Sequence, residues 1–145
     1  MKKKKRWLKS RNLVINTSPE IKMSGLISEY ASDYINMGEN TEERQNYLNG
    51  ACTAWNIAVL PETLREEALR RTIEGYKSMN PNTDDAEDFE HDLRTLIRKK
   101  LQMFPNIDKV IIDAMVEPIS ETKYKINIAS TEDRGLLKKI FKKHN

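Results

Sequence analysis

The sequence has one cysteine, five glycines and no long apolar run, and each shortage argues against a class of protein. Cys52 alone cannot form an internal disulfide, which favours a reducing compartment, and we expect a cytoplasmic protein. No segment approaches the roughly 18 consecutive apolar residues of a membrane-spanning helix, so integral membrane association is not expected. With so few glycines, loops that cradle phosphate groups are scarce.

Familiar catalytic and cofactor motifs are also missing from the sequence. The chain contains no Gly-x-Ser-x-Gly elbow, phosphate loop, dinucleotide fingerprint or zinc-ligand spacing. The basic start imitates a secretion signal, but the apolar stretch that follows, Leu13 to Ile15, is too short for one. We therefore predict no cofactor and no metal, assign no catalytic residue, and lean against an enzyme.

Positive charge is concentrated at the two ends of the sequence. Twelve of the 25 Lys and Arg residues lie at positions 2–11 and 134–145, which leaves 13 against all 22 acidic residues, a formal charge of −9 in between. Such separation steers association with an oppositely charged partner. The residues expected to contact an anionic or protein partner are Lys2, Lys3, Lys4, Lys5, Arg6, Trp7, Lys9, Arg11, Lys138, Lys139, Lys142 and Lys143.

Apolar residues at steps of three and four predict four helices, over residues 19–37, 42–59, 62–78 and 84–103. Ser18 and Pro19 supply the start of the first helix, and Gly38 supplies its stop. Asn40 with Glu43 resembles a capping box that opens the second helix.

Residues 109–116 and 123–129 are rich in strand formers, and the second segment alternates apolar and polar side chains, which predicts a β-hairpin. Thr131 is then expected to cap a last helix over residues 132–143, apolar on one side and lysine-rich on the other. This predicts an α+β fold, mainly α, in which a four-helix N-terminal body precedes the hairpin and a C-terminal amphipathic helix. We expect a disordered basic tail over residues 1–12 and one globular domain over residues 13–145.

The strongest metal-like spacing is Asp88-Phe89-Glu90-His91, which resembles the acid-x-x-His pattern of carboxylate-bridged metal sites. At about 100° per residue, however, His91 projects away from the apolar stripe and toward solvent. Acids fill the opening turns of this helix, and the bases Arg94, Arg98, Lys99 and Lys100 fill the later ones, which complements the helix dipole. We interpret the segment as a solvated, well-capped helix.

Four other residues have both a structural and a functional interpretation. Cys52 has no nearby base and is expected to be an unreactive core thiol. Trp55 is expected to anchor the core, and Asn56 to hydrogen-bond the following proline loop. Arg65 falls within the broad apolar arc of the third helix, so it either reaches solvent, the favoured interpretation, or is buried beside a carboxylate.

The segments Lys22-Met23-Ser24 through Tyr30-Ala31 and Ala54 through Glu62 are similar to those of a family of small bacterial proteins of unknown function. The resemblance implies a bacterial origin. It implies no activity, cofactor or ligand.

The leading functional hypothesis is a non-catalytic interaction module whose cationic ends contact an anionic or protein partner. A protein partner is favoured, nucleic acid is an alternative, and a homo-oligomer is allowed. The second hypothesis is a small enzyme, which a pocket lined by Glu29, Asp33, Arg65 or His91 would favour. The third is a toxin, antitoxin or regulatory partner. The last helix either completes the core, as favoured, or lies on an anionic membrane surface.

Overall fold

A computed structural model describes the backbone of residues 19–142 and the side chains of residues 23–141. Lys2, Lys3, Lys4, Lys5, Arg6, Trp7, Lys9, Arg11 and Lys143, together with the side chain of Lys142, were predicted to contact a partner and lie outside the described residues.

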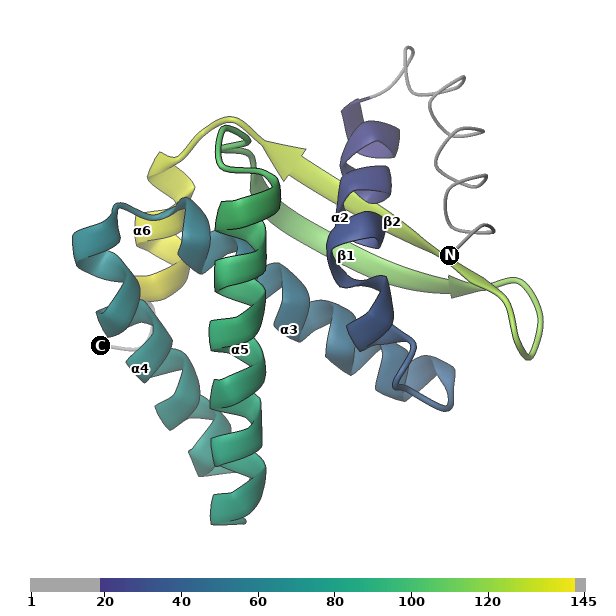
Figure 1. The fold of residues 1–145 in the computed structure, drawn as a ribbon, viewed down its shortest axis with the longest axis horizontal. Helices are drawn as coiled ribbons and strands as arrows, with labels where there is room; N and C mark the ends of the chain where they lie inside the picture. Colours follow the sequence, from purple (N-terminus) through teal and green to yellow (C-terminus); the bar gives the residue numbers. More distant parts are fainter. Residues whose placement is uncertain (1–18, 143–145) are drawn as a thin grey trace. The chain divides into compact units, whose positions relative to one another are not determined.

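Five helices and a two-stranded antiparallel sheet make up the described part of the chain (Figure 1). The α+β, mainly α prediction is confirmed. In chain order the elements are α2 (Pro19–Ile35), α3 (Thr41–Val59), α4 (Glu62–Met79), α5 (Thr83–Met103), β1 (Val110–Pro118), β2 (Tyr124–Thr131) and α6 (Gly135–Lys142).

Two compact units share these elements, and the division falls inside α3 between Cys52 and Thr53. The first, here called the hairpin unit, contains α2, the first part of α3 and most of the hairpin. The second, here called the α4/α5 unit, contains the rest of α3, α4, α5, the segment up to Val110, and α6.

The core of the hairpin unit is built from the apolar faces that the sequence predicts. Its buried side chains include Met23, Ile27, Tyr30, Leu48, Val116, Ile126 and Ile128. The hydroxyl of Tyr30 donates a hydrogen bond of 3.0 Å to the carbonyl of Ala51, which links α2 to α3 inside this unit. A buried hydroxyl needs such a partner, because leaving it without one costs about 1–3 kcal/mol.

Side chains cover both outer edges of the hairpin. The amide of Gln45 donates to the carbonyl of Ala114 at 3.0 Å and accepts from the amide of Val116 at 2.8 Å, as a neighbouring strand would. On the other edge, the hydroxyl of Ser24 accepts from the amide of Ile128 at 3.2 Å. Unpaired strand edges attract other chains, and these contacts occupy part of each edge.

The turn between α2 and α3 is confirmed as a cap. Asn40 Oδ1 accepts from the Glu43 amide at 2.8 Å, and Glu43 Oε1 accepts from the Glu39 amide at 2.8 Å, one residue earlier than in a standard capping box. Gly38 permits the tight approach, since a Cβ at this position would lie 2.7 Å from the backbone nitrogen of Arg44.

In the α4/α5 unit, helices α4 and α5 pack against each other (Figure 1). Near the end of α4, Tyr76 stacks on Phe89 of α5 with ring centres 4.5 Å apart. The buried apolar side chains of the two helices are Ala68, Leu69, Ile73, Ala86, Leu93 and Leu96. These are the faces that steps of three and four predict.

A buried tryptophan, Trp55, lies near the C-terminal end of α5. The indole of Trp55, fully buried, donates to the carbonyl of Lys109 at 2.8 Å. Lys100 is also buried, and its ammonium donates to the carbonyl of Ile107 at 2.7 Å and lies 5.0 Å from the indole ring centre. Trp55 is therefore a core anchor, as predicted, whereas the interpretation of Lys100 as a solvated helix-end charge is wrong.

The start of α6 differs from the prediction. Thr131 remains in β2, and its hydroxyl accepts from the Asp133 amide at 3.1 Å. The carboxylate of Asp133 in turn accepts from the amide of Gly135 at 3.0 Å, the first residue of the helix. The capping oxygen thus comes from Asp133 and not from Thr131, and the helix begins three residues later than expected.

Candidate functional site

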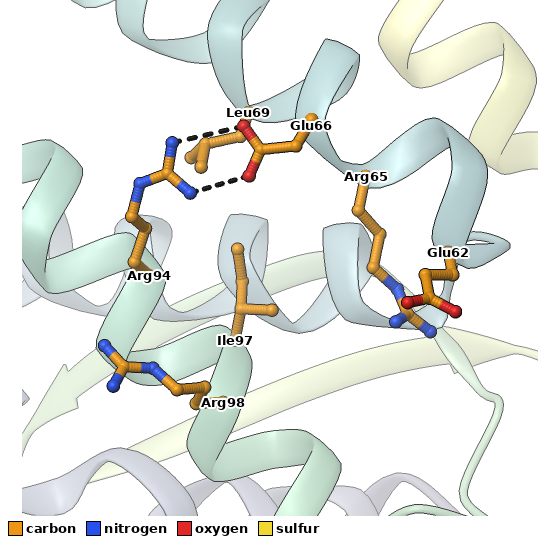
Figure 2. A pocket seen from close by; sticks show the side chains of 7 residues that line it. All are labelled: Glu62, Arg65, Glu66, Leu69, Arg94, Ile97 and Arg98. Atoms are coloured by element: carbon orange, nitrogen blue, oxygen red, sulfur yellow. Dashed lines mark hydrogen bonds and ion pairs between the residues drawn. The ribbon is translucent and has the colours of Figure 1, made fainter.

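A cleft of about 470 Å³ lies between α4 and α5, entirely within the α4/α5 unit. Its residues repeat at steps of three and four on each helix, so each helix turns one face toward the cleft. Helix α4 supplies Glu62, Arg65, Glu66 and Leu69, and α5 supplies Arg94, Ile97 and Arg98. Figure 2 shows these seven side chains.

One arginine of the cleft is fully engaged by acids. The guanidinium of Arg94 binds both carboxylate oxygens of Glu66, at 2.6 and 3.2 Å, across the two helices (Figure 2), and its Nε donates to Glu90 at 3.0 Å. Hydrogen bonding to Arg94 lowers the pKa of Glu66, and the same bond, with Glu90, raises the pKa of Arg94. This pair ties the helices together and leaves Arg94 little capacity for a ligand.

The other two arginines have free donors. Arg65 is half-buried, and its Nε donates to the carbonyl of Leu60 at 3.0 Å. Within residues 23–141, neither its terminal nitrogens nor the exposed guanidinium of Arg98 form a hydrogen bond or an ion pair. The favoured interpretation, that Arg65 reaches solvent, is correct for its terminal nitrogens only.

The cleft has an apolar lining between its charged residues. Leu69 is 2% exposed and Ile97 is half-buried, and both line the cavity. Figure 2 shows Ile97 in the middle of the view, below the pair formed by Arg94 and Glu66. The arrangement can therefore bind a small molecule that has one polar end and one apolar body.

Of the four residues that would favour an enzyme, only Arg65 lines this cleft. Glu29 and Asp33 belong to α2 in the hairpin unit, and His91, although on α5, is exposed outside the lining. His91 therefore points to solvent, as predicted. Across the described residues, no group of three or more His, Cys, Asp or Glu side chains is placed to hold a metal ion.

Cys52 is a buried thiol with a strongly shifted acidity. Its side chain is 6% exposed, and burial raises the pKa of Cys52 to about 12. At neutral pH the reactive thiolate is therefore almost absent, in agreement with the sequence interpretation.

Helix α6 exposes Lys138 and Lys139 and buries Leu137 in the α4/α5 unit. Leu137 is 2% exposed, whereas the neighbouring Lys138 and Lys139 are exposed. The carbonyl of Phe141 accepts from the Arg71 guanidinium at 3.2 Å, which connects α6 to α4. Leu137 and Phe141 also line a groove of about 270 Å³ on α4.

The sequence did not reveal the cleft as a whole. Arg65 stood out because it interrupts an apolar arc, but Glu66, Arg94 and Arg98 read as ordinary helix-surface charges. Glu66 and Arg94, which form an ion pair between the two helices, are 28 residues apart in the sequence. A spacing pattern within one helix carries no signal of such a meeting.

No family model matches the chain, and no curated protein and no solved structure matches it either. The bacterial origin implied by the resemblance stays a prediction. Within residues 19–142, no helix combines the length and apolar character needed to cross a membrane.

Proposed function

We propose that this protein is a cytoplasmic, non-catalytic interaction module that binds an anionic partner through the basic residues near its ends. One observation supports the proposal most directly. Lys138 and Lys139 are exposed on α6, and neither forms an ion pair with a described residue, while the adjacent Leu137 is buried. The two ammonium groups are thus held on an ordered helix and remain available to a partner.

The position of α6 also favours this role over that of a membrane-surface helix. A helix that lies on a membrane inserts its apolar face among the lipid chains. Leu137 is instead packed inside the α4/α5 unit, and the backbone carbonyl of Phe141 is bound by Arg71. The two exposed lysines therefore offer the more polar surface to a partner.

The acidities of Glu66 and Cys52 suit neither group for catalysis. A general base works best with a pKa near the working pH. The pKa of Glu66 is lowered by Arg94, and that of Cys52 is raised to about 12. These shifts make Glu66 a weaker base and Cys52 a weaker nucleophile, the reverse of what catalysis requires.

Two polyanions test the proposal and separate the classes of partner. The protein is mixed with a labelled single-stranded oligonucleotide or with labelled polyglutamate, and anisotropy is followed as salt concentration rises. We expect binding that weakens steeply with salt, because it depends on release of counterions. Tighter binding of the oligonucleotide would indicate nucleic acid, and tighter binding of polyglutamate an acidic protein.

A shortened chain provides the matching control. Deletion of residues 2–11 removes seven basic residues and should weaken binding, while the urea unfolding transition of the remaining chain stays cooperative. If neither polyanion binds, or if binding is insensitive to salt, the proposal is wrong.

A further inference from the structure

We propose that the cleft between α4 and α5 is a binding site for a small carboxylate with an apolar body, such as a short fatty acid. The cleft lies in the α4/α5 unit and does not include the lysines of α6, so this inference does not depend on the function proposed above. Its volume of about 470 Å³ falls in the range of small-molecule sites, roughly 300–1,000 Å³.

The charge of the lining indicates an anion. Among the residues that line the cleft, Arg94 and Glu66 neutralise each other through two hydrogen bonds, and Glu90, which also binds Arg94, lies outside the lining. Of the remaining charged residues, Arg65 and Arg98 are positive and only Glu62 is negative, which leaves one positive charge. No ion pair joins Glu62 to either arginine within the described residues. The terminal nitrogens of Arg65 and the whole guanidinium of Arg98 therefore form no ion pair within residues 23–141.

The surroundings of Arg65 strengthen this positive field. The ammonium of Lys100 is buried and bound to the carbonyl of Ile107. Burial is the main cause that lowers the pKa of Lys100; Asp108 opposes the shift, and the positive charge of Arg65 adds to it. Arg65 and Lys100 thus interact through like charges, and an anion bound at Arg65 would relieve that repulsion.

The single excess charge favours a carboxylate over a phosphate monoester. One carboxylate neutralises the lining, whereas a dianionic phosphate adds a second negative charge near Glu62 and Glu66. A guanidinium group presents paired donors that match the two oxygens of a carboxylate. The half-buried Ile97 offers apolar surface for the rest of the ligand, and the nearly covered Leu69 completes the apolar lining.

Three probes of equal chain length test this assignment by nuclear magnetic resonance titration of the full chain. They are octanoate, the neutral octanol and the dianionic octyl phosphate. We expect octanoate to bind and to shift the amides of Leu69 and Ile97. Octanol should bind at least roughly tenfold more weakly, since it cannot form the charged hydrogen bonds. Octyl phosphate should also bind more weakly than octanoate.

Two variants locate the site. The double variant Arg65→Gln with Arg98→Gln should weaken octanoate binding at least roughly tenfold, because glutamine cannot replace a charged donor. The matched control is Arg71→Gln, which removes an arginine from the groove between α4 and α6 and should leave octanoate binding unchanged. Circular dichroism checks that each variant stays folded.

Several outcomes would overturn the assignment. Octanoate could fail to bind, bind the double variant as tightly as the natural protein, or shift amides around Leu137 in place of those around Ile97. Equal binding of octanol would show that charge is irrelevant. Tighter binding of octyl phosphate would overturn the choice of a carboxylate.

Discussion

The buried thiol of Cys52 should lower the stability of this protein at alkaline pH. Its pKa rises from the usual 9.0 to about 12 because the folded protein keeps the thiol away from water. In the unfolded chain the same thiol loses its proton above pH 9.0. The unfolded state therefore gains free energy from ionisation that the folded state cannot gain, and the folded state becomes less stable between pH 9 and pH 12.

The size of this effect follows from the shift. The stability that folding gains by keeping the thiol neutral is fully present below pH 9.0, and it is lost as pH rises toward 12. At pH 10, one pH unit above the unfolded pKa, the loss is about 1.4 kcal/mol; its upper limit, three pKa units, is about 4 kcal/mol.

Replacement of Cys52 by alanine isolates the thiol. At pH 8 we expect Cys52→Ala to be less stable than the natural protein by about 1 kcal/mol, because a buried sulfur is removed from the core. At pH 10 the thiol ionises in the unfolded natural protein and stabilises that state, an effect that Cys52→Ala lacks. The stability difference between the two proteins should therefore shrink by about 1.4 kcal/mol and vanish or reverse. Urea unfolding followed by circular dichroism at the two pH values measures both differences.

The reasoning fails if the stability difference between the two proteins is the same at pH 8 and pH 10. It also fails if a thiol reagent modifies Cys52 rapidly in the folded protein at pH 8, since the thiolate would then be accessible. Buried Tyr30 also has a raised pKa, but it is present in both proteins and so largely cancels in the comparison.

Substitutions at two further positions, one in each unit, test contacts inside the units by urea unfolding. Trp55→Phe keeps an aromatic ring but loses the hydrogen bond to the carbonyl of Lys109, and we expect a loss of about 2–3 kcal/mol; a change below 0.5 kcal/mol would show that the contact does not matter. Gln45→Ala leaves the carbonyl of Ala114 and the amide of Val116 without their partner and should cost about 1–3 kcal/mol. Gln45→Glu still accepts from the amide of Val116 but cannot donate to the carbonyl of Ala114 at neutral pH. Its stability should therefore lie between that of the natural protein and that of Gln45→Ala.

Much of the fold could be predicted because local signals and burial agree. The starts of α2 and α4 at residues 19 and 62 match the proline signals, and Ile126 and Ile128 are buried as period two requires. The start of α6 was mistaken because Thr131 and Asp133 both qualify as caps. Strand pairing keeps Thr131 extended, and a sequence pattern does not contain that competition.

The site was less predictable for a related reason. Lys100 was expected in solvent as a helix-end charge, yet it is buried. Its ammonium donates a hydrogen bond to the carbonyl of Ile107, which lies beyond the end of α5. Arg98 was expected to interact favourably with the helix dipole. It lines a cleft because α4 packs beside it, and the sequence of α5 alone does not contain that information. Apolar periodicity predicts which face is buried, but it does not predict which charges meet across two helices.

The most direct test of the proposed function is the salt dependence of oligonucleotide binding. Each phosphate contact on a single strand contributes about 0.7 to the slope of log binding constant against log salt concentration. The double variant Lys138→Gln with Lys139→Gln should therefore lower the magnitude of that slope by about 1.4. The matched control, Lys77→Gln with Lys123→Gln, removes one exposed lysine of α4 and one between β1 and β2, and it should leave the slope unchanged. Equal slopes for the natural protein and the α6 variant would contradict the account.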